Sequence, residues 1–269
     1  MGLISIPFSV FSYWLMLHAK KEDPAPKRGL LRLLIAGALS VVLSIVLNIP
    51  LSAIISFFRF GVLSNPGEWL SAIRTDPAAL TEMVQNAKNN IQPTFLFNLI
   101  SMFITAGLLE EGLKFLTCRT AIRKEGTVRT WMDSVVCFAV VGITFEFLEN
   151  IAFGMNLDFI SALVRSLGCA HFVFGVIMGY FFGKYCVTGQ KKYAWLSFAI
   201  PLIYHTVTNA LMASIELNKV YNVLGSITGI SHMVATVVTV IIVLRWQKNR
   251  TLDVSVLQKK QKIERGGTT

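Results

Sequence analysis

Long apolar runs without a charged side chain alternate with short polar connections along the chain. The uninterrupted runs cover 1–19, 33–58, 89–109, 166–183, 193–215 and 220–244. Roughly 20 apolar residues in a helix cross a hydrocarbon core about 30 Å thick. A further apolar segment carries Glu146 and Glu149 within it. The pattern predicts an all-α fold, a polytopic membrane helix bundle of about seven transmembrane helices near 2–18, 32–58, 93–118, 131–156, 164–187, 193–215 and 222–246.

Basic residues are unequally distributed between the two sets of connections that these spans define. Nineteen of the 25 Lys and Arg residues lie on one set, which includes the C-terminal tail, and five lie on the other. Because connections rich in Lys and Arg stay in the cytoplasm, we expect the N-terminus outside and the C-terminus in the cytoplasm. We expect a multi-pass protein of the cell membrane, most simply the bacterial plasma membrane.

The connections also define the expected domain organisation. A single transmembrane bundle, 1–246, precedes a basic cytoplasmic tail, 247–269. The outer loop 59–92 is the one sizeable connection, and Asp76-Pro77 predicts the start of an interfacial helix within it. This helix is interpreted either as a surface helix that packs on the bundle or as a lid over an outward-facing site.

The composition agrees with a membrane protein. Hydrophobic residues make up 54% of the chain and charged residues 15%, whereas soluble domains are nearer a quarter charged. This excludes a disordered chain, a soluble nucleic-acid-binding domain and a small disulfide scaffold. The formal net charge of +10 lies mainly on the cytoplasmic side, so anionic membrane lipids are the expected partner there and no nucleic acid is implied. The four cysteines have no ligand-like spacing and are expected to pack as small apolar residues.

When the charged residues near the span ends are counted with the connections, Arg165 among those of the outer side, five remain inside the membrane and net −3: Glu110, Glu111, Glu146, Glu149 and Lys114. Each ionised residue near a bilayer centre costs about 2.5–3.5 kcal/mol on insertion scales, so such residues indicate function. Lys114 follows Glu111 by three residues and Glu110 by four, so its ammonium can reach either carboxylate. Two adjacent carboxylates in a low dielectric suit general acid–base chemistry.

Further polar residues occur in the neighbouring spans. Asn150 continues the stripe of Glu146 and Glu149 at i, i+3 and i+4, and the next spans carry His171, then His205 with Asn209 one turn later. At about 1.5 Å per residue, these groups and the glutamate pair fit one layer at or above the membrane midplane. The sequence therefore predicts a site that opens to the outside.

Two histidines and a set of glycines have simpler explanations. His18 lies at a span end and His232 stands alone in the last span, so both are interpreted as structural. Gly175, Gly179 and Gly183 recur at four-residue spacing, which predicts close packing between helices.

The chain resembles the PrsW-type intramembrane proteases, which are related to the CAAX-prenyl endopeptidases and bacteriocin-processing membrane proteases. The resemblance covers 110–209 in four motifs: EEGLK (110–114), FEFLEN (145–150), His171 with Gly179-Tyr180, and HTVTN (205–209). It implies that 93–215 is the catalytic core of an endopeptidase. It also implies that single-pass membrane proteins such as anti-sigma factors are cut near the outer face.

The resemblance implies roles for individual residues. Glu110 and Glu111 would activate water, and His171 would assist as a second base or as a ligand. His205 and Asn209 would polarise the scissile carbonyl or hold the oxyanion. Lys114, Glu146, Glu149 and Asn150 would support them.

One position departs from the pattern of the related CAAX enzymes. They carry Phe-x-x-x-His where this chain has Phe145-x-x-x-Glu149, so roles carried from them to Glu149 are open. A divalent metal such as zinc is one alternative, held by His171, His205 and a glutamate such as Glu149 with a water in the fourth position. The other is a metal-free proton relay, and we expect no obligatory structural metal.

Two other functions stay open from the residues alone. An ion- or proton-coupled transporter also uses membrane carboxylates, although no internal repeat typical of transporters is visible. A non-catalytic chaperone or immunity-type membrane protein could retain the fold, but every motif residue is present.

Overall fold

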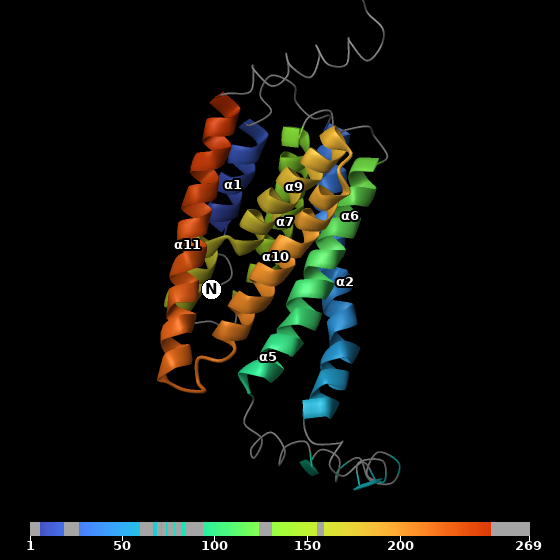
Figure 1. The fold of residues 1–269 in the computed structure, drawn as a ribbon, viewed down its shortest axis with the longest axis vertical. Coiled ribbons are helices and arrows are strands. Elements are labelled where there is room, and N and C mark those ends of the chain that lie inside the picture. The colour runs from blue at the N-terminus through green and yellow to red at the C-terminus, as the bar shows by residue number, and fades with distance from the viewer. Residues whose placement is uncertain are drawn as a thin grey trace, which may run out of the picture. The chain divides into compact units, whose positions relative to one another are not determined.

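The computed structural model describes residues 6–18, 27–59, 94–123, 131–154 and 159–248, with a few isolated positions between 67 and 83. Within these residues every regular element is a helix (Figure 1), so the all-α prediction is confirmed there. The elements are α1 (Ile6–His18), α2 (Lys27–Arg59), α5 (Phe95–Met102), the π-helix η2 (Phe103–Glu110), α6 (Glu111–Arg123), α7 (Trp131–Gly154), α8 (Phe159–Gly168), α9 (Ala170–Thr188), α10 (Lys191–Met212) and α11 (Lys219–Lys248).

Among the described residues, five helical stretches are long and apolar enough to cross a membrane, which makes this a multi-pass membrane protein. They are Gly29–Ser52, Phe95–Ile122, Trp131–Ala152, Ala162–Thr188 and Lys219–Trp246. The predicted spans 2–18 and 193–215 are not among them. The described part of α1 has only 13 residues, and α10 has 22 but carries polar residues such as His205 and Asn209 in its second half. The count of seven and the orientation of the termini stay predictions.

The chain divides into two compact units. Unit 1 comprises Met1–Leu39, Lys114–Ile200 and Gly229–Thr269, and unit 2 comprises Ser40–Leu113 and Pro201–Thr228. The helices α2, α6, α10 and α11 each contribute residues to both units. Each unit is described below by itself.

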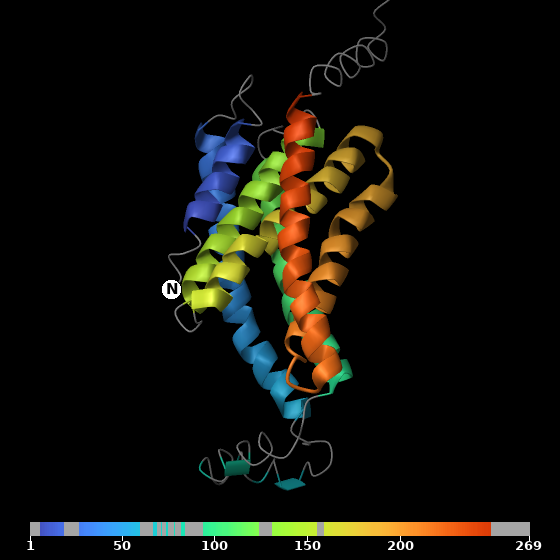
Figure 2. The same cartoon turned by 90° about the vertical axis from the view of Figure 1, so that its left-hand side faces the viewer.

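Unit 1 is built around α7, which packs against α1, α8 and α9. The buried side of α7 supplies an almost unbroken apolar series from Val135 to Ile143. Glycines let α9 approach the α7 backbone directly: a Cβ at Gly175 would meet Ala139 Cα, and one at Gly179 would meet Val135 Cα. The close packing predicted for these glycines is confirmed. The same helices are seen turned by 90° in Figure 2.

Unit 2 joins α5 and η2 to the second half of α10. Asn98 of α5 is buried and donates from Nδ2 to the Ala213 carbonyl at 3.1 Å and to Ser214 Oγ at 2.9 Å. Gly107 of η2 faces α10 so closely that a Cβ there would collide with Thr206 Oγ1. These contacts fix the helix that carries Glu110 and Glu111 against the helix that carries His205.

The segment predicted as one helix at 164–187 is interrupted. The chain leaves the helical conformation at Cys169, which adopts φ 36° and ψ 47°, so α8 ends at Gly168 and α9 begins at Ala170. Thr236 of α11 donates its hydroxyl to the Gly168 carbonyl and so satisfies an acceptor that the interruption frees. The interfacial helix expected from Asp76 and most of the basic tail lie outside the described residues.

Candidate active site

The N-terminus of α9 is held by a carboxylate from α7. The His171 backbone N–H donates to Glu146 Oε2 at 2.7 Å, and both residues are buried. The first N–H groups of a helix have no partner within the helix, and its N-terminus favours negative charge. Glu146 therefore stabilises the start of α9, directly after the interruption at Cys169.

The His171 ring is bound at both of its nitrogens. Lys114 Nζ lies 2.6 Å from Nδ1, and Glu149 Oε2 lies 2.8 Å from Nε2. A lysine ammonium can only donate, so Nδ1 accepts and the ring proton resides on Nε2, which donates to Glu149. Phe145 covers the ring with centroids 4.7 Å apart, and its own centroid lies 4.4 Å from Lys114 Nζ.

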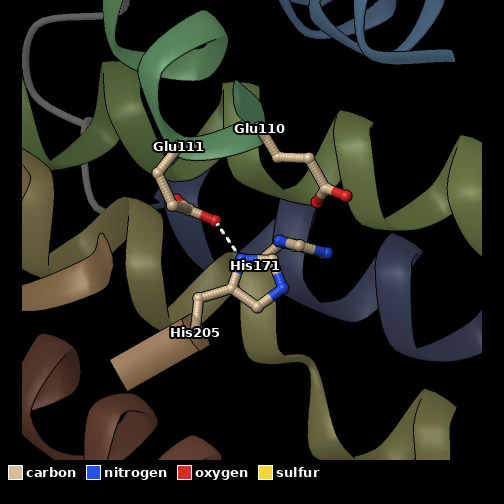
Figure 3. A group of neighbouring side chains, drawn as sticks. All are labelled: Glu110, Glu111, His171 and His205. Carbon is tan, nitrogen blue, oxygen red and sulfur yellow. Dashed lines mark hydrogen bonds and ion pairs between the residues drawn. The ribbon is translucent and has the colours of Figure 1, made fainter. Parts of the chain in front are cut away.

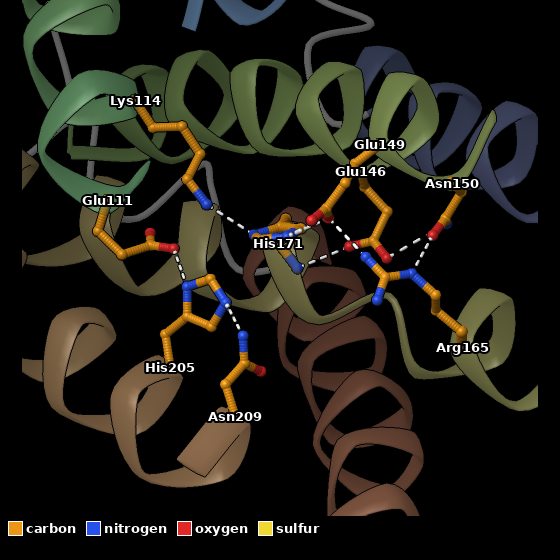
Figure 4. A network of polar contacts seen from close by, with 9 residues as sticks. All are labelled: Glu111, Lys114, Glu146, Glu149, Asn150, Arg165, His171, His205 and Asn209. Atoms are coloured by element: carbon orange, nitrogen blue, oxygen red, sulfur yellow. Dashed lines mark hydrogen bonds and ion pairs between the residues drawn. The ribbon is translucent and has the colours of Figure 1, made fainter. Parts of the chain in front are cut away.

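An arginine completes this network. Arg165 of α8 places Nη2 2.7 Å from Glu149 Oε2 and donates from Nε to Asn150 Oδ1 at 2.7 Å. Asn150 Nδ2 in turn donates weakly to Glu146 Oε1 at 3.4 Å. The contacts form a closed circuit from the His171 ring through Glu149, Arg165, Asn150 and Glu146 to the His171 backbone (Figure 4).

The sequence does not predict a role for Arg165 in the site. It counts there as an ordinary charge of the outer side. Its position in a short amphipathic stretch before His171 gives no marker of a network. The sequence offers one signal: a basic residue follows shortly after a span that contains two glutamates and no basic residue of its own.

Unit 2 contains a second buried pair of an acid and a histidine. His205 Nδ1 lies 2.6 Å from Glu111 Oε1, and the side chains are 6% and 0% exposed. Asn209 Nδ2 lies 3.1 Å from His205 Nε2, one helical turn further along α10. With the amide donating to Nε2, the imidazole proton resides on Nδ1 and is shared with the carboxylate.

The glutamate pair lies at the junction of two helix types. The π-helix η2 ends at Glu110, and α6 begins at Glu111. Inside η2, Thr105 Oγ1 donates to the Ser101 carbonyl at 2.8 Å, a bond that competes with the regular backbone ladder. Short π-helical segments are rare and are frequent at functional sites.

The donor set of unit 2 fits a divalent metal. Glu110, Glu111 and His205 each offer a ligand atom, and these atoms lie within 4.8 Å of one another, as Figure 3 shows for their side chains. Carboxylate oxygen and imidazole nitrogen are zinc ligands in catalytic sites. Glu149, the third ligand considered from sequence, contacts His171 and Arg165 in unit 1.

The structure thus gathers the predicted site residues into two sets. Unit 2 brings together Glu110, Glu111, His205 and Asn209. Unit 1 brings together Lys114, Glu146, Glu149, Asn150 and His171. His232 contacts Phe174 with ring centroids 6.4 Å apart, in agreement with a packing role.

Buried pairs of carboxylate and imidazole in apolar helices can move protons, as the hydrolysis of a peptide bond requires. A family model described as "PrsW family intramembrane metalloprotease" matches residues 25–246. The chain belongs to this family, and it is a protease. No solved structure matches it.

Relatives named "Protease PrsW" give the same result. The protein of Geobacillus kaustophilus is 29% identical over 171 residues, 62% of this chain and 70% of the relative. That of Bacillus subtilis is 30% identical over 128 residues, covering 45% and 58%, and that of Clostridioides difficile is 28% identical over 120 residues, covering 41% and 50%. The match therefore spans only about half of the length of the last two relatives. None of these names favours a transporter or a chaperone.

Proposed function

We propose that the protein hydrolyses a peptide bond of a membrane-anchored substrate, with the Glu111–His205 pair as the centre that handles the proton. The observation that carries this is the 2.6 Å contact between two almost completely buried side chains. A buried carboxylate beside an imidazole can accept a proton and return it without exchange with bulk solvent. Glu110 adds a second carboxylate at the same junction of helices.

The steps follow from these groups. Glu111 takes a proton from the attacking water, whose oxygen bonds to the scissile carbonyl carbon. The carbonyl oxygen becomes an oxyanion and accepts a hydrogen bond from the Asn209 amide, which His205 orients. The C–N bond then breaks, and the leaving nitrogen receives the proton that Glu111 holds, so that the carboxylate is restored. We assign His171 of unit 1 the role of a second base, as the family resemblance implies.

We further propose that a divalent metal such as zinc would be held by Glu110, Glu111 and His205, in place of the proton that Glu111 and His205 share. When bound, such an ion supplies Lewis-acid activation of water and of the carbonyl. The donor set of unit 2 and the description of the family as metalloproteases support this proposal. They weigh against the metal-free relay considered from sequence.

The substrate class and setting are inferred from sequence. We propose seven spans with the N-terminus outside, a plasma-membrane location, anionic lipids at the basic cytoplasmic face, and single-pass substrates such as anti-sigma factors cut near the outer face. The distribution of 19 against five basic residues supports this orientation. It also supports a site nearer the outer surface, because His171 and His205 lie far along their helices from the basic ends.

The test is cleavage of a single-pass substrate in proteoliposomes that contain the purified enzyme. Glu111→Gln preserves size and removes the negative charge, so it should lower the cleavage rate at least about 100-fold, the usual scale of a lost acid–base group. Glu110→Gln and His205→Gln should also lower it strongly. Glu216→Gln, at an exposed position after α10, is the matched control and should cleave like wild type.

Two results would contradict the proposal. One is full cleavage by Glu111→Gln and His205→Gln. The other is proton-coupled uptake of a solute that these variants lose while no substrate is cut, which would favour the transporter. For the metal, dialysis against a chelator should abolish cleavage and zinc should restore it. Elemental analysis should give about one ion per chain in wild type and less in Glu110→Gln.

A further inference from the structure

We propose that Arg165 is a positioning residue: it fixes the Glu149 carboxylate so that this carboxylate holds the His171 ring in one tautomer and one orientation. The inference rests on the proposed function, in which His171 acts as a base. It gives Glu149, whose role the related CAAX enzymes leave open, a definite task. Arg165 lies outside every motif that marks the family resemblance.

The two contacts of the Glu149 carboxylate involve the same oxygen atom. Glu149 Oε2 accepts both from His171 Nε2, at 2.8 Å, and from Arg165 Nη2, at 2.7 Å. One carboxylate oxygen is therefore shared between the imidazole and the guanidinium. Without the guanidinium this oxygen loses one of its two donors, so the direction of the carboxylate is less restricted.

The guanidinium is itself fixed at a second point. Its Nε donates to Asn150 Oδ1 at 2.7 Å, so the planar group bridges two adjacent residues of α7. Arginine suits this task because its donors are arranged in a rigid fork, whereas lysine offers a single point charge. α8 thereby sets the direction of a side chain on α7 that orients a side chain on α9.

The exposure of the pair distinguishes positioning from simple stabilisation. The Arg165 side chain is 38% exposed and that of Glu149 14%, and partly exposed ion pairs contribute little to folding. If Arg165 had only a structural role, its replacement should therefore have a small effect on both stability and catalysis. A positioning role predicts a large effect on catalysis with little effect on folding, because second partners of catalytic imidazoles typically account for about 10- to 100-fold in activity.

The kinetic test uses the proteoliposome assay of the proposed function. Arg165→Met should lower kcat about 10- to 100-fold with KM nearly unchanged, and Arg165→Lys should recover part of the loss. Arg119→Met, which removes an exposed arginine of α6, is the matched control and should behave like wild type. In a double-mutant cycle, Arg165→Met should cost less than about threefold when Glu149 is already Gln, because both act through one contact.

A second measurement does not depend on cleavage. The chain has four histidines, so a spectrum of the protein labelled with ¹⁵N-histidine is simple, and His171→Gln assigns the signal. In wild type His171 should carry its proton on Nε2. In Arg165→Met the His171 signals should shift or broaden, while those of His205 stay in place.

The outcomes are separable. If wild type cleaves and Glu111→Gln does not, yet Arg165→Met keeps its kcat or raises only KM, the positioning role is overturned while the proposed function stands. Multiplicative losses in the double-mutant cycle, or a His171 proton on Nδ1, also overturn it. If wild type cleaves no substrate, the proposed function fails, and the histidine spectrum still shows whether Arg165 holds the His171 ring in one tautomer. If Arg165→Met does not fold, both the cycle and the spectrum are read from Arg165→Lys.

Discussion

Residues of one type have three different tasks in this protein, and each task follows from what the carboxylate contacts. Glu111 faces an imidazole, Glu149 lies between an imidazole and a guanidinium, and Glu146 accepts from a backbone N–H at the start of a helix. Only the first contact places a proton donor and acceptor at the centre proposed for hydrolysis. The third is a stabilising contact, and it can be tested as one.

Glu146→Gln keeps an acceptor oxygen near the His171 N–H but removes the negative charge at the N-terminus of α9. We expect the free energy of unfolding to fall by about 0.5–2 kcal/mol, the usual value of a helix-terminal charge. Steric trapping in bicelles measures it. The variant should still cleave substrate at a rate close to that of wild type. Loss of cleavage without loss of stability would show instead that Glu146 takes part in the chemistry.

At the scale of elements, α7 and α9 form the closest helix–helix contact described in unit 1. Backbone lies against backbone at successive glycines, and one of these contacts reaches His171, because a Cβ at Gly142 would collide with the His171 carbonyl oxygen. Packing without side chains is the common way for membrane helices to approach closely. This close packing also fixes the position of the His171 backbone against α7.

Gly142→Ala should therefore be destabilising by about 1–3 kcal/mol, the usual cost of overpacking, and should reduce cleavage because His171 moves. Gly229→Ala is the matched control, since its Cβ would meet only Val164 Cγ1 at 3.8 Å. That change should leave stability equal or slightly higher, as alanine favours helix. Equal stability of the two variants, measured by the same trapping assay, would contradict direct contact at Gly142.

At the scale of the whole molecule, the path of α10 decides the topology. This helix is long enough to cross a bilayer but is not one of the five clearly apolar spans, and seven spans require that it cross. Two exposed positions flank it: Gln190 directly precedes Lys191, and Asn218 follows Met212 by six residues.

In a variant without native cysteines, Asn218→Cys should react with a membrane-impermeant maleimide in intact cells. Gln190→Cys should react only after the cells are opened, because the segment beside Lys191 and Lys192 is expected in the cytoplasm. Mass shifts on a gel measure both reactions. Labelling of both positions from the same side would mean that α10 does not cross and that the seven-span prediction is wrong.

The sequence predicts most of the helices, because apolar runs of membrane length have few alternatives. It also singles out the polar residues that the structure brings together in two sets, since charge inside such runs is costly; their part in catalysis stays a prediction. It does not predict the interruption at Cys169, because a non-glycine residue with φ 36° has no compositional marker. Neither does it predict η2, whose residues suit an ordinary α-helix. The contact of Lys114 with His171, 57 residues away, depends on packing between α6 and α9 and lies beyond any rule of helical spacing.

Arg165 changes the electrical balance of the site. With carboxylates ionised and imidazoles neutral, the circuit in unit 1 contains Glu146 and Glu149 against Lys114 and Arg165 and is electroneutral. The intramembrane sum of −3 expected from sequence thus becomes −2, and both charges belong to Glu110 and Glu111 in unit 2. A double negative charge within hydrocarbon is stable only beside a compensating cation or after protonation. The divalent ion proposed for unit 2 would carry the charge that balances Glu110 and Glu111.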